Sequence, residues 1–241
     1  MKLLFFSVFL FLPVAIFPQN IQVHWDLRHT IDAKLNSKNF PSFSFEYFAN
    51  IDTIGTGSFL FKLDSRMDGN NSNPSQIFTQ ISQSIKFWKP KIYLSATYSG
   101  GLGVTSTYYG YYISNSFGIG PAYAIKWKEA WISASTYLRV NVFDKPSLDP
   151  QVNLWFGRFF LNYRIYFSGS FVFWSQNRDQ GNEDTKELRG KKIAFFGDPQ
   201  IWFKIKKRFS AGSKINIYYH LLSDDNHVQV YPTIGLKYQF N

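Results

Sequence analysis

Apolar and polar residues alternate in about twelve short runs between Ile21 and Asn241, and each run is followed by a turn-rich segment. Apolar residues at every second position give a strand one apolar face and one polar face. Strands of this kind satisfy their backbone hydrogen bonds in a bilayer only by closing into a barrel. The pattern therefore predicts an all-β protein, a transmembrane antiparallel β-barrel of about twelve strands of the outer-membrane type.

The first three runs send charged side chains to one face. In the first run, Ile21, Val23, Trp25 and Leu27 alternate with Gln22, His24, Asp26 and Arg28. The polar faces of the next two carry Glu46, Lys62, Asp64 and Arg66. A dry protein core does not accept so many charges, whereas a water-filled lumen does. This argues against a secreted soluble β-protein with an apolar ligand cavity.

The remaining strands are predicted from the same alternation, and the connections between them alternate in length. Residues 88–91, 126–129 and 205–210 are predicted as tight turns. The stretches 67–75, 99–111, 143–150 and 175–190 are longer and rich in Asn, Gly, Asp and Ser. Short turns at one end and long loops at the other are typical of outer-membrane barrels, with the loops outside and both termini in the periplasm. The predicted strands after the third are 76–87, 91–99, 112–125, 130–142, 151–157, 161–174, 192–204, 213–222 and 229–240.

The first 19 residues have the pattern of an export signal. Lys2 precedes an apolar stretch that is too short for a spanning helix and is followed by Pro18. We expect residues 1–19 to be a cleaved signal peptide and residues 20–241 to form the barrel. The absence of cysteine excludes a lipid-anchored lipoprotein and a disulfide-stapled domain.

The composition and net charge of the chain indicate which kinds of partner it can have. Aromatic residues make up 20% of the sequence although the mean hydropathy is only −0.20, which suits a polar lumen and an aromatic exterior. The net charge of +10 favours anionic solutes or the phosphates of lipopolysaccharide. The positive residues are spread over turns and polar strand faces, so we expect no nucleic-acid partner. We expect a monomer surrounded by outer-membrane lipid.

Two clusters of aromatic residues fall where the rims of a barrel would lie. Tyr108, Tyr109, Tyr111 and Tyr112 precede one predicted strand, and Trp88 and Trp127 lie at predicted turns of the opposite end. Phenol and indole rings favour the headgroup level of a bilayer. The pattern predicts two interfacial girdles.

Several segments, spread over the chain in a consistent order, resemble an uncharacterised outer-membrane family related to the Tsx-type nucleoside-specific channels. They are QNIQVHWDLRH at 19–29, FPSFSFEYF at 40–48, YSGGLG at 98–103, GDPQIWF at 197–203 and YPTIGLKYQF at 231–240. The resemblance implies a twelve-stranded barrel and passive uptake of nucleosides or similar small solutes. The aromatic Phe240 beside the C-terminus is similar to the signal that barrel-assembly machinery recognises, so that machinery is an expected partner.

Strand parity assigns the residues that would line the pore. Aromatic faces can stack on a flat ring, while amides and carboxylates bind hydroxyl groups. The same side chains can also fill a narrow barrel as a salt-bridged network, and both interpretations stay open for each of them. Pro199 cannot donate to a β-ladder, which predicts a bend or bulge beside Asp198 and Gln200. Parity also places Arg164 and His220 inside, and the main solute candidates are Trp155, Trp174, Trp202, Tyr137, Arg139, Asp198, Gln200, Glu46, His24, Asp26 and Arg28.

Enzymatic and metal-binding signals are weak in the sequence. A barrel enzyme of the outer-membrane phospholipase type needs a serine, a histidine base and an orienting polar group. None of the four histidines has a local serine signature, and His29 is the best of them. His24 and Asp26 share a face but lack a third metal ligand. We expect no catalytic residue, no metal site and no cofactor.

These observations predict an outer-membrane channel for passive uptake of small solutes, with nucleosides as the candidate solute. One alternative is a barrel with enzymatic, structural or adhesive use. The other is the secreted soluble β-protein considered above.

Overall fold

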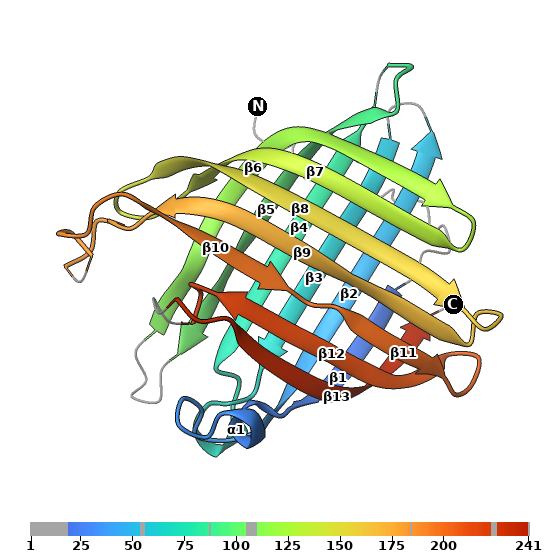
Figure 1. Ribbon diagram of the computed structural model, residues 1–241, viewed down its shortest axis with the longest axis horizontal. Coiled ribbons are helices and arrows are strands. Elements are labelled where there is room, and N and C mark those ends of the chain that lie inside the picture. The colour runs from blue at the N-terminus through green and yellow to red at the C-terminus, as the bar shows by residue number, and fades with distance from the viewer. Residues whose placement is uncertain are drawn as a thin grey trace, which may run out of the picture.

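The strands close into one antiparallel barrel of twelve strands, as the sequence predicts (Figure 1). We analysed a computed structural model, which describes residues 19–53, 56–86, 88–104, 110–183, 185–222 and 226–240. The proposed signal peptide therefore lies outside the described residues, apart from Gln19. The strands are β1 (Gln19–Asp26), β2 (Phe40–Thr53), β3 (Thr56–Arg66), β4 (Gln76–Ile85), β5 (Ile92–Val104), β6 (Gly110–Trp127), β7 (Ala130–Asn141), β8 (Ser147–Phe160), β9 (Ile165–Asn177), β10 (Lys191–Gly197), β11 (Gln200–Lys204), β12 (Phe209–Tyr219) and β13 (Gln229–Phe240).

The thirteen strand segments fill twelve strand positions, which we call the walls of the barrel, because β10 and β11 share one position. Both segments pair with β9 on one side and with β12 on the other. Asp198 and Pro199 separate them, which confirms the predicted irregularity at Pro199. Proline has no backbone N–H to give to the ladder, so the strand is interrupted where it occurs.

Closure comes from β1, which lies between β2 and β13. Gln19 pairs with Phe240 and Asp26 pairs with Thr233, so the first and last strands are joined along the whole of β1. Closure leaves no strand edge unpaired in the lipid.

The connections alternate in length as predicted. The β8–β9 and β11–β12 turns are short and lie at the same end as the C-terminus, whereas the 178–190 connection between β9 and β10 extends from the other end (Figure 1). A short helix, α1 (Arg28–Ile31), and the 3-10 turn η1 (Asn70–Ser72) also lie in the long connections. No helix among the described residues is apolar and long enough to cross a bilayer.

Several predicted strand boundaries are wrong, mainly at the long-loop end. The strands β5, β6, β8 and β9 extend into the stretches 99–111, 143–150 and 175–190 that we predicted as loops. The parts of these stretches that lie in strands pair with the neighbouring strands of the barrel. At the other end, residues 161–164 form a turn, and Leu161, Asn162 and Tyr163 have positive φ angles.

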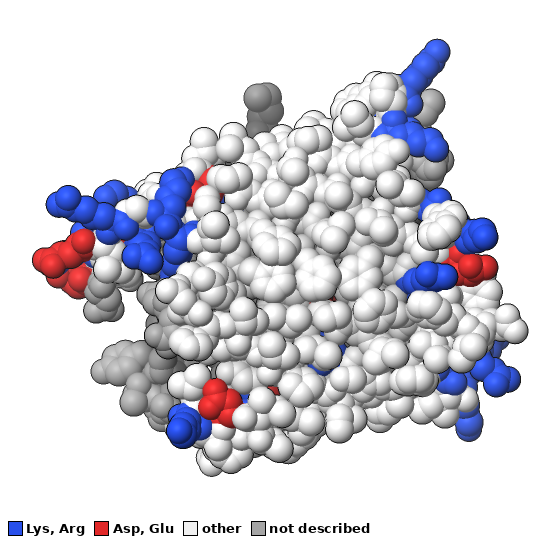
Figure 2. Space-filling view, in the orientation of Figure 1, with Lys and Arg blue, Asp and Glu red and all other residues white. Residues whose placement is uncertain are grey.

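The exterior of the barrel is apolar and its charged residues lie at the two ends. Outward side chains of β1 alternate with buried ones, and Val23 and Trp25 are 42% and 50% exposed. On the face shown in Figure 2, Lys, Arg, Asp and Glu gather at the two rims and leave an uncharged band between them. Tyr111 and Tyr112 are exposed at one rim, and Trp88 and Trp127 at the other. Tyr108 and Tyr109 lie outside the described residues.

We predict that Val23→Arg destabilises the folded barrel by about 2–4 kcal/mol, the expected cost of a cation on a lipid-facing strand near the bilayer midplane. Val23→Leu is the matched control. The free energy of unfolding from lipid vesicles, measured by urea titration, checks this. Equal stability of the two variants would show that this face of β1 does not contact hydrocarbon.

Candidate functional site in the barrel lumen

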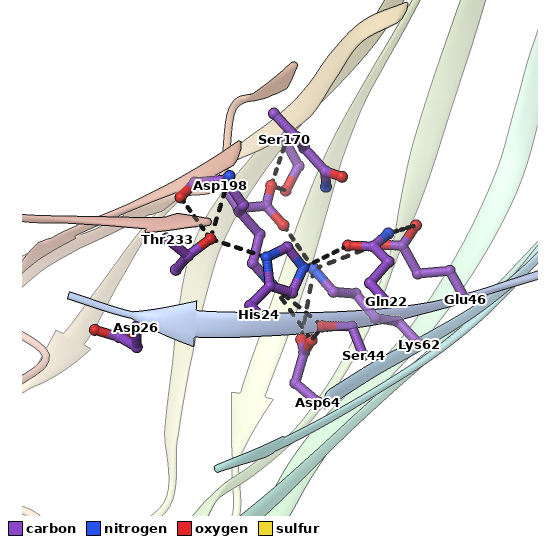
Figure 3. Close-up of polar contacts among 12 residues, drawn as sticks. Gln22, His24, Asp26, Ser44, Glu46, Lys62, Asp64, Ser170, Asp198 and Thr233 are labelled. Atoms are coloured by element: carbon purple, nitrogen blue, oxygen red, sulfur yellow. Dashed lines mark hydrogen bonds and ion pairs between the residues drawn. The ribbon is translucent and has the colours of Figure 1, made fainter. Parts of the chain in front are cut away.

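Charged side chains from opposite walls meet in the lumen, near the middle of their strands (Figure 3). Lys62 on β3 places its Nζ 2.6 Å from Oδ2 of Asp198, in the break between β10 and β11. The same Nζ lies 3.5 Å from Oδ2 of Asp64 and 4.0 Å from Oε1 of Glu46. Lys62 is 4% exposed and Asp198 is 2% exposed, so this ion pair is shielded from bulk solvent. We call Lys62, Asp198, Asp64, Glu46 and Lys214 the lumen charge cluster.

The strand break positions Asp198. Its Oδ1 accepts hydrogen bonds from the backbone N–H and the hydroxyl of Ser170, at 2.8 and 2.6 Å. Its own backbone N–H donates to the Ser170 carbonyl at 3.0 Å. These contacts fix one carboxylate oxygen to β9 and leave the other for Lys62.

A second cation completes the lumen charge cluster. Lys214 on β12 lies 3.7 Å from Oδ1 of Asp64 and donates to the hydroxyl of Ser44 at 3.2 Å. The Ser44 hydroxyl in turn donates to Asp64. Two lysines and three carboxylates from four walls therefore pair across the pore, with one formal negative charge in excess. The salt-bridged network considered at the sequence level is present here.

His24 packs beside the lumen charge cluster without joining an ion pair. Its Nδ1 lies 2.9 Å from the Thr233 hydroxyl and its Nε2 lies 2.9 Å from Oε1 of Gln22. Its ring meets the ring of Trp202 edge-on, with 5.6 Å between centroids. Gly235 gives the ring room, because a Cβ there would lie 2.6 Å from Nδ1.

At the long-loop mouth, Asp26 and Arg28 pair with each other. The Nε and Nη2 of Arg28 donate to the two carboxylate oxygens of Asp26, at 3.1 and 2.8 Å. The guanidinium lies 4.8 Å from the ring centroids of both Phe40 and Tyr231. We predicted Arg28 on the first strand, but β1 ends at Asp26 and Arg28 begins α1. It is buried under the mouth because the helix folds it back over Asp26.

The three candidate tryptophans all come from inward positions, but their contacts differ. Trp202 is 1% exposed, and Nζ of Lys237 lies 4.5 Å from its ring centroid. Trp174 has the guanidinium of Arg139 at 5.1 Å from its ring. Trp155 is half-buried between Asn153 and Gly157 on β8. No contact among the described residues joins the three rings, so they form separate sites.

The other predicted candidates are also placed inside. The Tyr137 hydroxyl lies 3.0 Å from the hydroxyl of Ser95. Oε1 of Gln200 accepts from Nε1 of Trp202 at 2.8 Å, and Oε2 of Glu46 accepts from Nε2 of Gln22 at 3.2 Å. Arg139 is 5% exposed on β7.

Two parity assignments are wrong, and some inward residues with clear roles were not among the solute candidates. Arg164 lies exposed in the β8–β9 turn, and His220 lies past the end of β12 with a positive φ angle. The predicted strand 161–174 began too early and the predicted strand 213–222 ended too late, so the alternation was counted through residues that form turns. Lys214, Thr233 and Gln22 share the parity of residues that we did select, so alternation alone could have found them.

The described residues show no assembled metal or catalytic centre. No group of three or more His, Cys, Asp or Glu side chains in these segments could hold a metal ion. His29 binds the backbone carbonyl of Asn36 at 2.6 Å, and His220 binds that of Ile193 at 2.8 Å. The lumen contains a paired charge cluster flanked by aromatic rings and further cations.

Fold and lumen together define a β-barrel of the outer-membrane class. A family model described as "Domain of unknown function (DUF5020)" matches residues 18–240, and the chain belongs to that family. None of the proteins with curated descriptions matches the sequence.

Several solved structures are similar to this chain, and the first of them supports the barrel fold. The NanC porin is similar with a TM-score of 0.54 and 8% identity, covering 92% of this chain and 100% of that one. LpxR from Salmonella typhimurium has a TM-score of 0.45 and 9% identity, covering 92% of this chain and 100% of that one. OmpT of Vibrio cholerae, as a loop L8 deletion mutant, has a TM-score of 0.41 and 6% identity, covering 93% and 98%. None of these findings links the chain to the Tsx-type channels.

We predict that Lys62→Met destabilises the barrel more than Asp198→Asn, with single losses of up to about 3–5 kcal/mol for a buried pair. Lys62→Met leaves three carboxylates facing Lys214 alone, whereas Asp198→Asn leaves Lys62 with Asp64 and Glu46. The double variant should recover part of the loss.

The measurement is a double-mutant cycle on the free energy of unfolding. Lys186→Met is the control, because its pair with Glu183 is exposed and should contribute at most about 1 kcal/mol. Strict additivity of Lys62→Met and Asp198→Asn would argue against a stabilising ion pair.

Proposed function

We propose that the protein is an outer-membrane channel for small polar solutes, in which the lumen charge cluster limits conduction. The observation that carries this is the Lys62–Asp198 ion pair, which joins opposite walls in the middle of a polar lumen. Lysine has a flexible four-carbon stem and a rotatable ammonium, so Lys62 can exchange Asp198 for Asp64 or Glu46. Such an exchange would open a path without unfolding a wall.

The histidine contacts favour a channel over a phospholipase-type enzyme. An enzyme of that kind needs a serine hydroxyl within reach of a histidine base. His24 contacts a threonine and a glutamine, His29 contacts a backbone carbonyl, and His220 contacts a backbone carbonyl and the amide of Asn226. None of these partners is a serine. We therefore propose no catalytic residue and no cofactor, and the porin named among the similar structures agrees with a conducting barrel.

The membrane arrangement follows from loop length. We propose that the short turns and both termini of the barrel chain face the periplasm, and that the long loops face the outside of the cell. Lipid and lipopolysaccharide would surround a monomeric barrel. Phe240, which pairs with Gln19 where β1 meets β13, would be recognised by the barrel-assembly machinery.

Nucleosides are the candidate solutes, on the strength of inward aromatic rings beside amide groups. Cations already cover the rings of Trp174 and Trp202, so stacking there would require Arg139 or Lys237 to move. Trp155 has no such cover among its described neighbours and is half-buried. We therefore propose Trp155 as the ring that a nucleoside base contacts.

We predict that refolded protein shows small single-channel conductances in a planar bilayer, and that Lys62→Met/Asp198→Asn shows larger ones. The substitutions remove the ion pair while keeping side chains of similar length, so the lumen charge cluster loosens. Correct insertion is checked by heat-modifiable migration on gels. Inserted barrels that conduct in neither form would favour a structural or enzymatic role.

We predict that nucleosides reduce the current and that Trp155→Ala weakens this block at least about tenfold, because base stacking on an aromatic ring contributes about 1–3 kcal/mol. Trp25→Ala is the control, since Trp25 faces outward and is 50% exposed. A conducting channel that nucleosides do not block would remove the nucleoside assignment and leave the channel itself in place.

A further inference from the structure

Arg139 is a buried cation, and two of its three guanidinium nitrogens lack a hydrogen-bond partner. It is 5% exposed, and its Nε and Nη1 have no hydrogen-bond partner. Arginine stays charged at all ordinary pH values, so it cannot lower the cost of its unpaired donors by losing a proton. A buried donor without an acceptor costs about 1–3 kcal/mol and more for a charged group. Such a group therefore calls for a functional explanation.

The nearest carboxylate in the wall is committed elsewhere. Asp149 is the direct partner of Arg139 in the β7–β8 ladder. Its Oδ1 accepts from Lys191 at 2.5 Å and from Ser175 at 2.9 Å, and its Oδ2 accepts from Ser147 at 2.5 Å. Both oxygens are thus held by other donors, and the guanidinium of Arg139 lies over the ring of Trp174 instead.

An open, charged cleft lies at the long-loop end of the barrel, and Arg139 is not among the residues that line it. The cleft has a volume of about 860 Å³. Lys191 lines this cleft and also pairs with Asp149, the ladder partner of Arg139. Four basic and two acidic side chains line it, together with Asn177, Leu188 and Gly190: Lys145, Lys186, Arg189 and Lys191 against Asp179 and Glu187.

Part of this charge is neutralised within the loops. Lys145 donates to Asp179 at 2.5 Å, and this hydrogen bond holds the pKa of Asp179 below its ordinary value. Asp179 therefore stays ionised and neutralises Lys145 near neutral pH. Lys186 pairs with Glu183. Lys191 pairs with Asp149, and Arg189 lines the cleft together with Glu187, which carries the opposite charge. The loops therefore add little net charge, and Arg139 itself is the group that attracts an anion.

We propose that Arg139 is the binding group for a small oxyanion, a carboxylate or phosphate carried by the solute, which reaches it from the long-loop end of the lumen. The guanidinium supplies two N–H groups that lack acceptors, and carboxylate and phosphate oxygens are the acceptors that arginine binds most strongly. Trp174 supports the guanidinium from its ring face. The proposal deepens the channel function and rests on it for transport, but binding at Arg139 does not require conduction.

The first experiment measures binding without transport. Refolded protein in detergent is titrated with inorganic phosphate and, separately, with acetate at constant ionic strength, and tryptophan fluorescence is followed. An anion that pairs with Arg139 changes the field on the Trp174 ring, so wild type should show a saturable change. Trp174→Phe should remove most of that signal.

The variants then assign the site. Arg139→Gln should weaken binding at least about tenfold, the equivalent of losing one charged hydrogen bond. Arg158→Gln is the matched control. This substitution also removes one positive charge, but Arg158 is exposed on the outside of β8. Gel migration verifies that each variant is folded. Equal binding by wild type and Arg139→Gln, or no saturable change in wild type, would overturn the proposal.

A second experiment separates this site from the channel function. Where the protein conducts, the reversal potential in a salt gradient should show anion preference that Arg139→Gln reduces and Arg158→Gln does not. Binding without any conductance would support the site and overturn the channel. Conductance with unchanged selectivity in Arg139→Gln would overturn the site and leave the channel.

Discussion

Ladder closure between β1 and β13 is the constraint on which the rest of the molecule depends. An open sheet of this size would leave a row of unpaired N–H and C=O groups in hydrocarbon, which no spanning structure tolerates. Eight consecutive pairs from Gln19–Phe240 to Asp26–Thr233 remove that edge. Closure also fixes which face of every strand is inside, because a shift of one residue would exchange the two faces. The outward rows, such as Val23 and Trp25, then meet lipid, and the polar rows are forced together in a narrow lumen.

That confinement explains why the lumen charge cluster exists. Polar side chains of twelve walls cannot all reach solvent, so charges must find partners across the pore. The Lys62–Asp198 pair joins residues 136 positions apart in the chain. The break at Pro199 contributes directly, because there the backbone N–H of Ser170 donates to the Asp198 carboxylate instead of to a backbone carbonyl of the neighbouring strand. The irregularity in the wall is thus part of how the centre of the lumen is built.

Alternation and turn composition were sufficient to predict the barrel, the strand number, the inward face and the irregular strand at Pro199. They failed at strand ends. Arg164 and His220 were placed inside because an alternation of period two can be counted past the residue at which the chain turns. Arg28 was placed on the first strand because nothing in the pattern marks the start of α1. The partners of inward residues were also out of reach, because parity states that Lys62 and Asp198 both face inward but not that the barrel brings their side chains together. The rings of Trp174 and Trp202 were predicted as open stacking surfaces for the same reason, although Arg139 and Lys237 lie over them.

The net charge of +10 says little about what the lumen selects. Most of the basic residues near the turns, such as Lys126, Lys206 and Arg208, lie at the ends of the barrel, where they face headgroups and solvent. Charges exposed to water and salt act weakly beyond about 10 Å. In the lumen, by contrast, Lys62 and Lys214 are matched by carboxylates, so they contribute little excess field. In the proposed channel, selectivity depends on the few inward cations that are left unmatched, and of these Arg139 combines deep burial with two nitrogens that no protein group accepts. A single buried arginine can outweigh the whole basic rim, because its interaction with an anion is screened by salt much less than that of an exposed cation.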